Sequence, residues 1–411
     1  MELFARLTGI DENSLHPKFK LLRDEYCYIG AKKIVEDWAS DFIDRDGKLA
    51  IEFQTTFHSA LWELYLHAVL KHLGFNINTE RNRPDFIIQG AEEFYIEAVV
   101  SEIKSGGTLE SERTHDDVLS MLSPISSRQE FSSLINEAIV RQSNSIQYKL
   151  KKYTGYADAN GKWKKGYKET DWVDENKPFV IAISSYDQIN YGKEYIYSML
   201  ALLYGWYFDP ETGKFSKIEF IKKPGTQSEI KLGIFNDENF RDVSAIFFCN
   251  TMSMGKLSSL SKSSNFDPMF VMNVRYDFNP PFFKIHEVSP QSPEHLLDGL
   301  YLFKNPNAKV AFSNKAIKAS GLMEMSVDEV GFAMEGSFRP VVARYCDLLG
   351  HAYKELIKAT AASNYNDTVA ELVALADRDD KSRGAVPPLL FQTPTYFIRI
   401  RRTLFALVVD R

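Results

Sequence analysis

The sequence predicts a mixed α/β fold, because helical and strand-like segments alternate in its first half. Apolar residues recur at helical spacing over 57–75, and Gly74 suits the end of a helix. Two runs rich in Ile, Val, Phe and Tyr, 83–88 and 94–100, flank a break that contains Gly90. We expect these two runs to pair as adjacent antiparallel strands.

Three further segments complete this expected core. A short strand is predicted over 75–79, and a long helix over 130–153. The continuous apolar run at 177–184, which includes Pro178, is typical of a buried strand. The expected order from residue 53 to residue 190 is therefore helix, three strands, helix, strand.

Acidic residues occupy unusual positions in these elements. Asp85 and Glu97 fall in the two adjacent strands, and Glu63 lies among apolar residues of the first helix. A carboxylate in an apolar strand is costly to bury unless it is paired or binds a cation. Two converging carboxylates also repel each other until a positive charge lies between them. The pattern favours a divalent metal ion.

With Glu63, Pro84-Asp85 and Glu97 in this order of elements, the segment from about 53 to 184 resembles the PD-(D/E)xK nuclease superfamily. The resemblance implies a restriction-endonuclease-like αβββαβ core with additional strands. It also implies a metal-dependent DNA endonuclease that hydrolyses phosphodiester bonds. A part in bacterial genome defence against viruses follows from the common use of this family.

One position departs from the family pattern. The family expects Glu-x-Lys, whereas this chain has Glu97-Ala98-Val99. In a subset of the family the lysine comes from the following helix, which makes Lys149 the first candidate. Lys152 and Lys104 are the next candidates.

The resemblance also implies roles for these residues. Asp85 and Glu97 are expected to bind Mg²⁺ or Mn²⁺, hard ions that prefer oxygen ligands. The carbonyl of Ala98 is expected as a third ligand, and Glu63 is expected to bind through water or to hold a second ion. Lys149 is expected to orient or deprotonate the attacking water.

The missing lysine after Glu97 supports a rival interpretation, in which an inactive nuclease fold binds nucleic acid or a partner protein. A structural subunit of a larger complex is a third alternative, favoured by the acidic charge. The expected partner is DNA, with RNA as an alternative. A second copy of the chain and a defence-system protein remain open as further partners.

Composition limits the class of protein. The 411 residues carry a formal net charge of −6 and are 44% hydrophobic. This acidity argues against a general nucleic-acid coating protein. No apolar run approaches the ~20 residues that span a bilayer, and the N-terminus lacks a signal pattern. We therefore expect a cytoplasmic protein without membrane contact.

Local charge differs from the overall balance. The segment 148–168 interleaves lysines with aromatic residues. Such a segment is typical of nucleic-acid contact, in which cations neutralise phosphates and aromatic rings stack on bases. A solvated helix end followed by an exposed hairpin explains the same pattern equally well.

Four parts are expected along the chain. Residues 1–52 form a helical segment packed on the core at 53–190. An α/β extension over 191–320 is expected to continue the sheet through strands at 243–249 and 269–274. The part 321–411 is expected to be largely helical, over about 325–377, with a final strand.

Two segments outside the core have specific expectations. The polar loop 101–127 is expected to act as a mobile cover over the site. The final strand, at 395–409, carries Arg399, Arg401 and Arg402, which we assign to its solvent face rather than to a nucleic-acid or subunit contact.

Histidines do not suggest a metal site in the sequence. His58, His67 and His72 fall on one expected helix, but His67 and His72 are five residues apart and point to different faces. No other histidine lies near them in the sequence. A Gly-x-Ser-x-Gly hydrolase motif is also missing.

Overall fold

The structure is a computed structural model, and it describes most of the first 347 residues together with two short pieces beyond them. The described ranges are 2–103, 106–107, 110–112, 128–185, 194–209, 214–249, 252–276, 283–327, 331–337, 341–347, 354–355 and 358–359. The expected strand at 395–409, with its three arginines, and most of the expected loop at 101–127 lie outside these ranges. So does Lys104.

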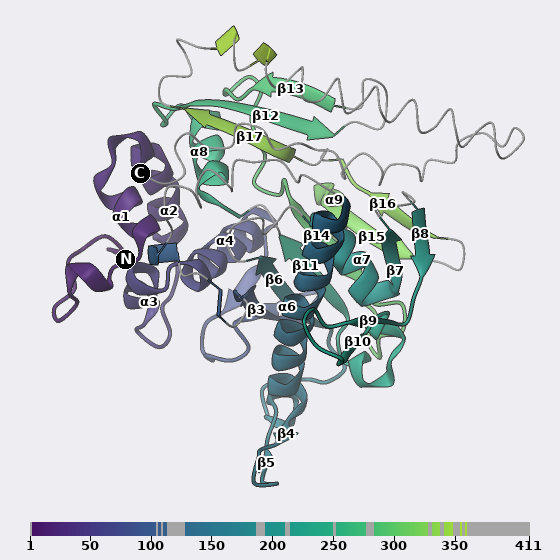
Figure 1. Ribbon diagram of the computed structural model, residues 1–411. Helices are drawn as coiled ribbons and strands as arrows, with labels where there is room; N and C mark the ends of the chain where they lie inside the picture. Colours follow the sequence, from purple (N-terminus) through teal and green to yellow (C-terminus); the bar gives the residue numbers. More distant parts are fainter. Residues whose placement is uncertain are drawn as a thin grey trace, which may run out of the picture.

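An eight-stranded mixed sheet forms the centre of the molecule (Figure 1). Its strands, in spatial order, are β1 (Asn76–Asn78), β2 (Phe86–Gln89), β3 (Phe94–Ser101), β6 (Phe179–Ser185), β11 (Ala245–Cys249), β14 (Leu300–Lys304), β15 (Met323–Val327) and β16 (Phe332–Glu335). The neighbours β3–β6, β6–β11 and β14–β15 are parallel, and the other pairs are antiparallel. The mixed α/β class is confirmed.

The segment that contains the candidate acids runs in the expected order. Helix α4 (His58–His72) precedes β1, β2 and β3, and helix α6 (Arg128–Thr154) separates β3 from β6. Strand β6 is buried along its whole length, as its apolar run predicts. Adjacent parallel strands require a crossover connection, and α6 lies in the connection between β3 and β6.

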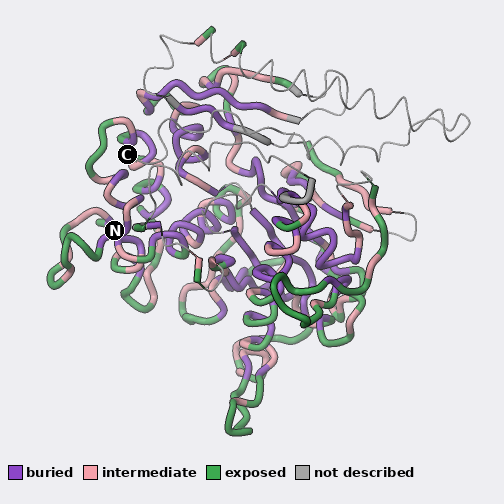
Figure 2. The backbone as a smooth tube through the Cα atoms, viewed as in Figure 1, coloured by how far each residue is buried: buried purple, intermediate pink, exposed green. Residues whose placement is uncertain are grey.

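Helices cover both faces of the sheet, and each face has its own core (Figure 2). On one face, α4 shares a core with the helices α1 (Pro17–Asp24), α2 (Ile29–Ala39), α3 (Leu49–Thr55) and α8 (Met254–Ser263). On the other face, α6 packs with α7 (Tyr197–Tyr204). Alternate residues of each central strand therefore enter different cores.

A second sheet lies apart from the main one. It consists of β13 (Phe283–Glu287), β12 (Phe270–Tyr276) and β17 (Val341–Asp347), with β12 in the middle (Figure 1). The strand expected at 243–249 extends the main sheet as β11. The strand expected at 269–274 does not extend it, which corrects that expectation. The backbone of β12 pairs with β13 and β17, and its side chains alternate between the core that contains α8 and the core that contains α6 and α7.

The expected helix over about 325–377 is wrong over the described residues up to 347, because β15, β16 and β17 are strands, whereas the described residues 354–355 and 358–359 are helical. In β17, Val341, Val342 and Tyr345 favour extended backbone. Pairing with β12, some 70 residues earlier in the chain, decides the conformation. Such long-range pairing leaves no local signal in the sequence.

Small elements complete the described structure. They are the hairpins β4–β5 (Tyr156–Ala157 and Trp163–Lys164), β7–β8 (Trp206–Asp209 and Lys214–Lys217) and β9–β10 (Phe220–Lys222 and Glu229–Lys231), and the helix α9 (Lys315–Ser320). Within the described residues, every helix is too short or too polar to span a lipid bilayer.

Candidate active site

The pairing of β2 with β3 places Asp85 opposite Glu97. The register joins Phe86 to Ile96, so its continuation by one residue brings Asp85 to Glu97. Phe86 and Ile96 enter the α4 core, whereas Ile87 enters the α6 core. By alternation, Asp85 and Glu97 face α6.

Helix α6 supplies the positive charge at this place. The Nζ atom of Lys149 lies 2.6 Å from Oε2 of Glu97 and 3.3 Å from Oδ2 of Asp85. All three side chains are shielded from water: Lys149 is 9% exposed, Glu97 2% and Asp85 24%. The structure thus brings the first lysine candidate to both acids, over a separation of 52 and 64 residues.

Lys152, the second lysine candidate, and Ala98, the expected third ligand, make other contacts. The Nζ atom of Lys152 lies 4.6 Å from the centre of the Tyr148 ring, away from direct contact with the acids. The amide N–H of Ala98 donates to Oδ2 of Asp85 at 2.7 Å. This hydrogen bond holds the Asp85 carboxylate against β3, and the role of the Ala98 carbonyl as a metal ligand stays a prediction.

Glu63 reaches the site from α4. The neighbouring Trp62 donates its indole N–H to the Ala182 carbonyl at 3.1 Å, which fixes this helix on β6. Glu63 is partly buried, and the charges of Asp85 and Lys149 both act on it. The backbone of Asp85 is held from a third side, because Arg45 donates to its carbonyl at 2.5 Å.

Burial and mutual repulsion change the protonation of these acids. Burial, with the charge of Asp85 added to it, raises the pKa of Glu97 to about 7 and that of Glu63 to about 8. Lys149 opposes both shifts without cancelling them. Burial would lower the pKa of Lys149, but Asp85 and Glu97 raise it above its usual value. The lysine therefore stays charged, and one ammonium serves three carboxyl groups.

This donor set fits a hard divalent cation. Carboxylate oxygens are the ligands that Mg²⁺ and Mn²⁺ prefer, and a cation would offset the burial and the charge repulsion that raise the pKa values of Glu97 and Glu63. Glu63, Asp85 and Glu97 are not among the triads of the described residues whose ligand atoms all lie within 4.8 Å. At least one of the three acids would therefore reach a shared ion through a water molecule, which is the role expected of Glu63.

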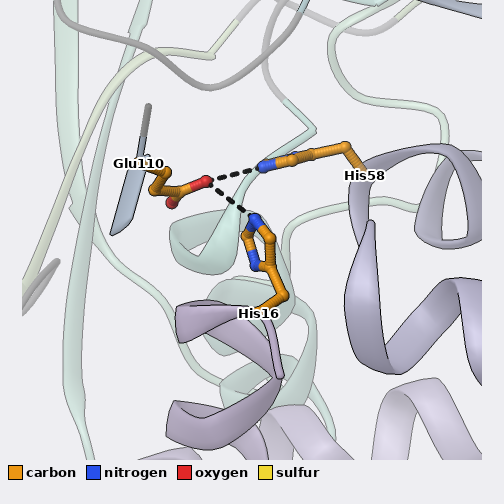
Figure 3. A group of neighbouring side chains, drawn as sticks. All are labelled: His16, His58 and Glu110. Atoms are coloured by element: carbon orange, nitrogen blue, oxygen red, sulfur yellow. Dashed lines mark hydrogen bonds and ion pairs between the residues drawn. The ribbon is translucent and has the colours of Figure 1, made fainter. Parts of the chain in front are cut away.

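A second group of polar side chains does converge this closely. His16, His58 and Glu110 could hold a metal ion, since one ligand atom from each lies within 4.8 Å of the other two (Figure 3). The Nε2 atoms of His16 and His58 lie 3.2 Å and 2.9 Å from Oε2 of Glu110. Imidazole nitrogen combined with carboxylate oxygen is a donor set that suits transition metals.

The same group is also an ion-pair cluster. The Nζ atom of buried Lys18 lies 3.2 Å from Oε1 of Glu110. Burial alone would raise the pKa of Glu110, but Lys18 and the two histidines lower it well below its usual range. Burial lowers the pKa of His58 to about 4, so this imidazole is neutral near pH 7. A bound cation would have to share Glu110 with the ammonium of Lys18.

Sequence reasoning missed this cluster because its members are distant in the chain. His16 precedes α1, His58 begins α4, and Glu110 belongs to the loop after β3. The helix-face argument compared His58 only with His67 and His72. Those two lie elsewhere: His67 is near Asp41, and His72 faces His295. No spacing pattern could have joined three separate segments.

No protein-family model, no curated protein and no solved structure matches this chain. The site is therefore interpreted from its own geometry.

Proposed function

We propose that this chain is a metal-dependent DNA endonuclease with Asp85, Glu97 and Lys149 at its centre. The observation that supports it best is the contact of Lys149 with both acids, from the helix after the Glu97 strand. A Lys on α6 thereby supplies the charge that Val99 lacks. A part in bacterial genome defence belongs to the same proposal, by resemblance to PD-(D/E)xK nucleases.

Each residue of the acid site has its own proposed role. Asp85 and Glu97 would hold Mg²⁺ or Mn²⁺, with Glu63 behind a water molecule. When bound, the ion supplies a more acidic water and neutralises charge on the phosphate. Binding requires Glu97 to release its proton. The ion pairs of Lys149 with the two acids would then weaken, which would leave its ammonium available to pair with a phosphate oxygen.

The charge state of Lys149 limits its role. Because Asp85 and Glu97 raise its pKa, the ammonium cannot accept a proton near pH 7. Of the two roles expected from the sequence, orientation of the water fits a charged ammonium, whereas deprotonation would require Lys149 to lose its own proton first. A positive charge held in a dry site stabilises developing negative charge strongly.

The test is cleavage of plasmid and linear DNA in Mg²⁺, Mn²⁺ or EDTA. Asp85→Ala and Glu97→Ala should abolish cutting in both metals, since each removes a ligand. Glu80→Ala removes an exposed acid from the loop before Asp85 and serves as the matched control. RNA substrates run in parallel. Wild-type protein inert on all DNA forms would overturn the proposal and leave the inactive binding module in its place.

The proposed part in defence has a separate test. Cells that express the wild-type chain should resist infection by some bacteriophages, and cells that express Asp85→Ala should not. Equal protection by both proteins would show that cutting at this site is not what protects.

A further inference from the structure

The end of α6 and the β4–β5 hairpin form one projecting feature, which we call the basic hairpin and define as residues 148–168. Figure 1 shows β4 and β5 at the far end of α6, extending away from the rest of the molecule. All residues from Ala159 to Lys165 are exposed (Figure 2). The hairpin therefore contributes little to the core, and its residues are available for contact with a partner.

Charge is concentrated in this feature. The basic hairpin has seven lysines and a single acid, Asp158, whereas the whole chain has a net charge of −6. Lys149 belongs to the acid site, Lys168 pairs with Asp242 at 3.1 Å, and Lys164 lies 3.6 Å from Asp158. Lys162 and Lys165 have exposed side chains. A polyanion is the complementary partner.

Exposed aromatic rings accompany the lysines. Trp163 is 56% exposed, Tyr148 55% and Tyr156 42%. Since Tyr156 pairs with Lys164 and Ala157 pairs with Trp163, Tyr156 and Trp163 project from opposite faces of the hairpin. Both faces therefore carry an aromatic ring.

The ring of Trp163 is held in one orientation. Its indole N–H donates to Glu169 at 3.2 Å. The ring also lies against Gly155, where an added Cβ would come within 2.7 Å of Cζ2. Gly155 has φ of +86°, so both its backbone and its lack of a side chain suit this contact. An exposed ring fixed in place is a suitable platform for stacking.

The basic hairpin begins at the acid site, and the charge of Glu97 also acts on its last residues. Lys149 contacts Asp85 and Glu97 at one end. Near the other end of the basic hairpin, burial, followed by the charge of Glu97, raises the pKa of Tyr167 to about 12. Lys152, one turn beyond Lys149, also acts on Glu97. A strand held along the hairpin would thus lead toward the candidate catalytic acids.

We propose that the basic hairpin binds unpaired DNA, with Trp163 stacked on an exposed base and Lys162, Lys164 and Lys165 on neighbouring phosphates. This inference rests on the proposed nuclease function and narrows its substrate to DNA with a single-stranded portion. Aromatic rings stack on bases only when the bases are unpaired, whereas lysines alone contact duplex and single strand alike. The exposed rings therefore favour the single strand.

The experiment measures binding of fluorescent single-stranded, duplex and forked DNA, and of single-stranded RNA, in EDTA, where no cleavage interferes. Wild-type protein should bind single-stranded and forked DNA more tightly than duplex. Trp163→Ala should weaken single-strand binding by roughly tenfold or more, and Trp163→Phe should restore most of it, because stacking contributes ~1–3 kcal/mol per base. Substituting the three lysines together by alanine should lower the salt slope by about 2, at ~0.7 per phosphate.

The β9–β10 hairpin supplies a matched control. It also exposes an aromatic ring, Phe220, with Lys222 and Lys223 beside it. Phe220→Ala with Lys222→Ala and Lys223→Ala should leave binding unchanged. Equal loss in both hairpins, preference for duplex or RNA, or wild-type affinity in Trp163→Ala would overturn the inference.

Because single-strand binding and DNA cleavage are measured separately, the two proposals can be overturned independently. If DNA is cut in Mg²⁺ by the hairpin variants as by wild type, the proposed function stands and the inference is wrong. If the hairpin binds single strands as described but no substrate is cut in any metal, the inference stands and the nuclease proposal is wrong.

Discussion

Asp85 and Glu97 share a single counter-ion, the Lys149 ammonium, and Glu63 lies within reach of the same charges. This imbalance is the physical basis of the proposed cation binding. It also distinguishes the acid site from the Glu110 cluster, where Lys18 and two histidines meet one carboxylate. When ionised, the acids of the first place outnumber the single ammonium beside them, whereas Glu110 at the second place meets an ammonium and two imidazoles.

The imbalance predicts a pH dependence of stability in the metal-free protein. The pKa values of Glu97 (about 7) and Glu63 (about 8) lie above the ordinary value of 4.5. The folded chain therefore keeps protons that the unfolded chain has released. This contribution to stability is complete below pH 4.5 and is lost as pH rises through 7 to 8.

Denaturant unfolding from pH 6.5 to pH 8 in EDTA measures this effect. His58 changes charge mainly below this window, between about 4 and 6.5. The free energy of unfolding should fall with pH in wild type and in Glu80→Gln, and fall less in Glu97→Gln. Mn²⁺ should restore stability at pH 8 more than at pH 6.5, since it binds the ionised acids. Identical slopes for wild type and Glu97→Gln would contradict the assignment.

At the residue level, the sequence was sufficient to predict the features that depend on local periodicity. The apolar runs of β2 and β3 predicted that both acids lie on neighbouring strands, whereas Lys149 was expected from the family resemblance, in a subset of which the lysine comes from the following helix. Periodicity could not predict the raised pKa values, which depend on three segments at once. It could not predict the Glu110 cluster for the same reason.

At the level of elements, the sheet of β12, β13 and β17 depends on a buried charge cluster. Glu294 accepts from the guanidinium of Arg344 at 2.6 and 2.9 Å, and Lys256 of α8 lies 3.3 Å away. Burial would raise the pKa of Glu294, but Arg344 and Lys256 hold it far below its usual range. The cluster joins β17 to α8, and so joins the second sheet to the core that contains α4.

Arg344→Ala should therefore destabilise the protein by about 3–5 kcal/mol, because it removes one partner of a fully buried ion pair. Arg241→Ala, which removes an exposed arginine paired with Glu238, should change stability by less than about 1 kcal/mol. Urea unfolding of both variants compares them directly. If Arg344→Ala lowered the free energy of unfolding by less than about 1 kcal/mol, the cluster would not be what joins the second sheet to the core that contains α4.

The strands over 323–347 show why the expected helix in this part of the chain was wrong. Arg344 is a charged residue inside a buried strand, and it is buried only because Glu294 lies beneath it. Alternation of apolar and polar residues is lost when such a partner comes from a distant segment. In the first half, neighbouring strands follow each other in sequence, and prediction succeeds.

On the scale of the whole molecule, acidic and basic residues are concentrated in different places. A central sheet with a core on each face carries an acid site against α6, and a basic hairpin continues the same helix outward (Figure 1). An acidic chain can therefore still present a local basic surface to DNA. The predicted class of fold is confirmed by this architecture, while the function rests on the proposal above.

The most direct test of the central claim compares two lysines on one helix. Lys149 contacts both acids, whereas Lys151, two positions later, is exposed. In single-turnover cleavage of DNA with Mg²⁺, Lys149→Ala should lower the rate by about 10²-fold or more, because a charge near the phosphate is lost. Mn²⁺ binding, followed by calorimetry, should persist or strengthen, since the competing ammonium is gone. Lys151→Ala should cut at nearly the wild-type rate at saturating DNA. Wild-type cutting by Lys149→Ala would contradict the account.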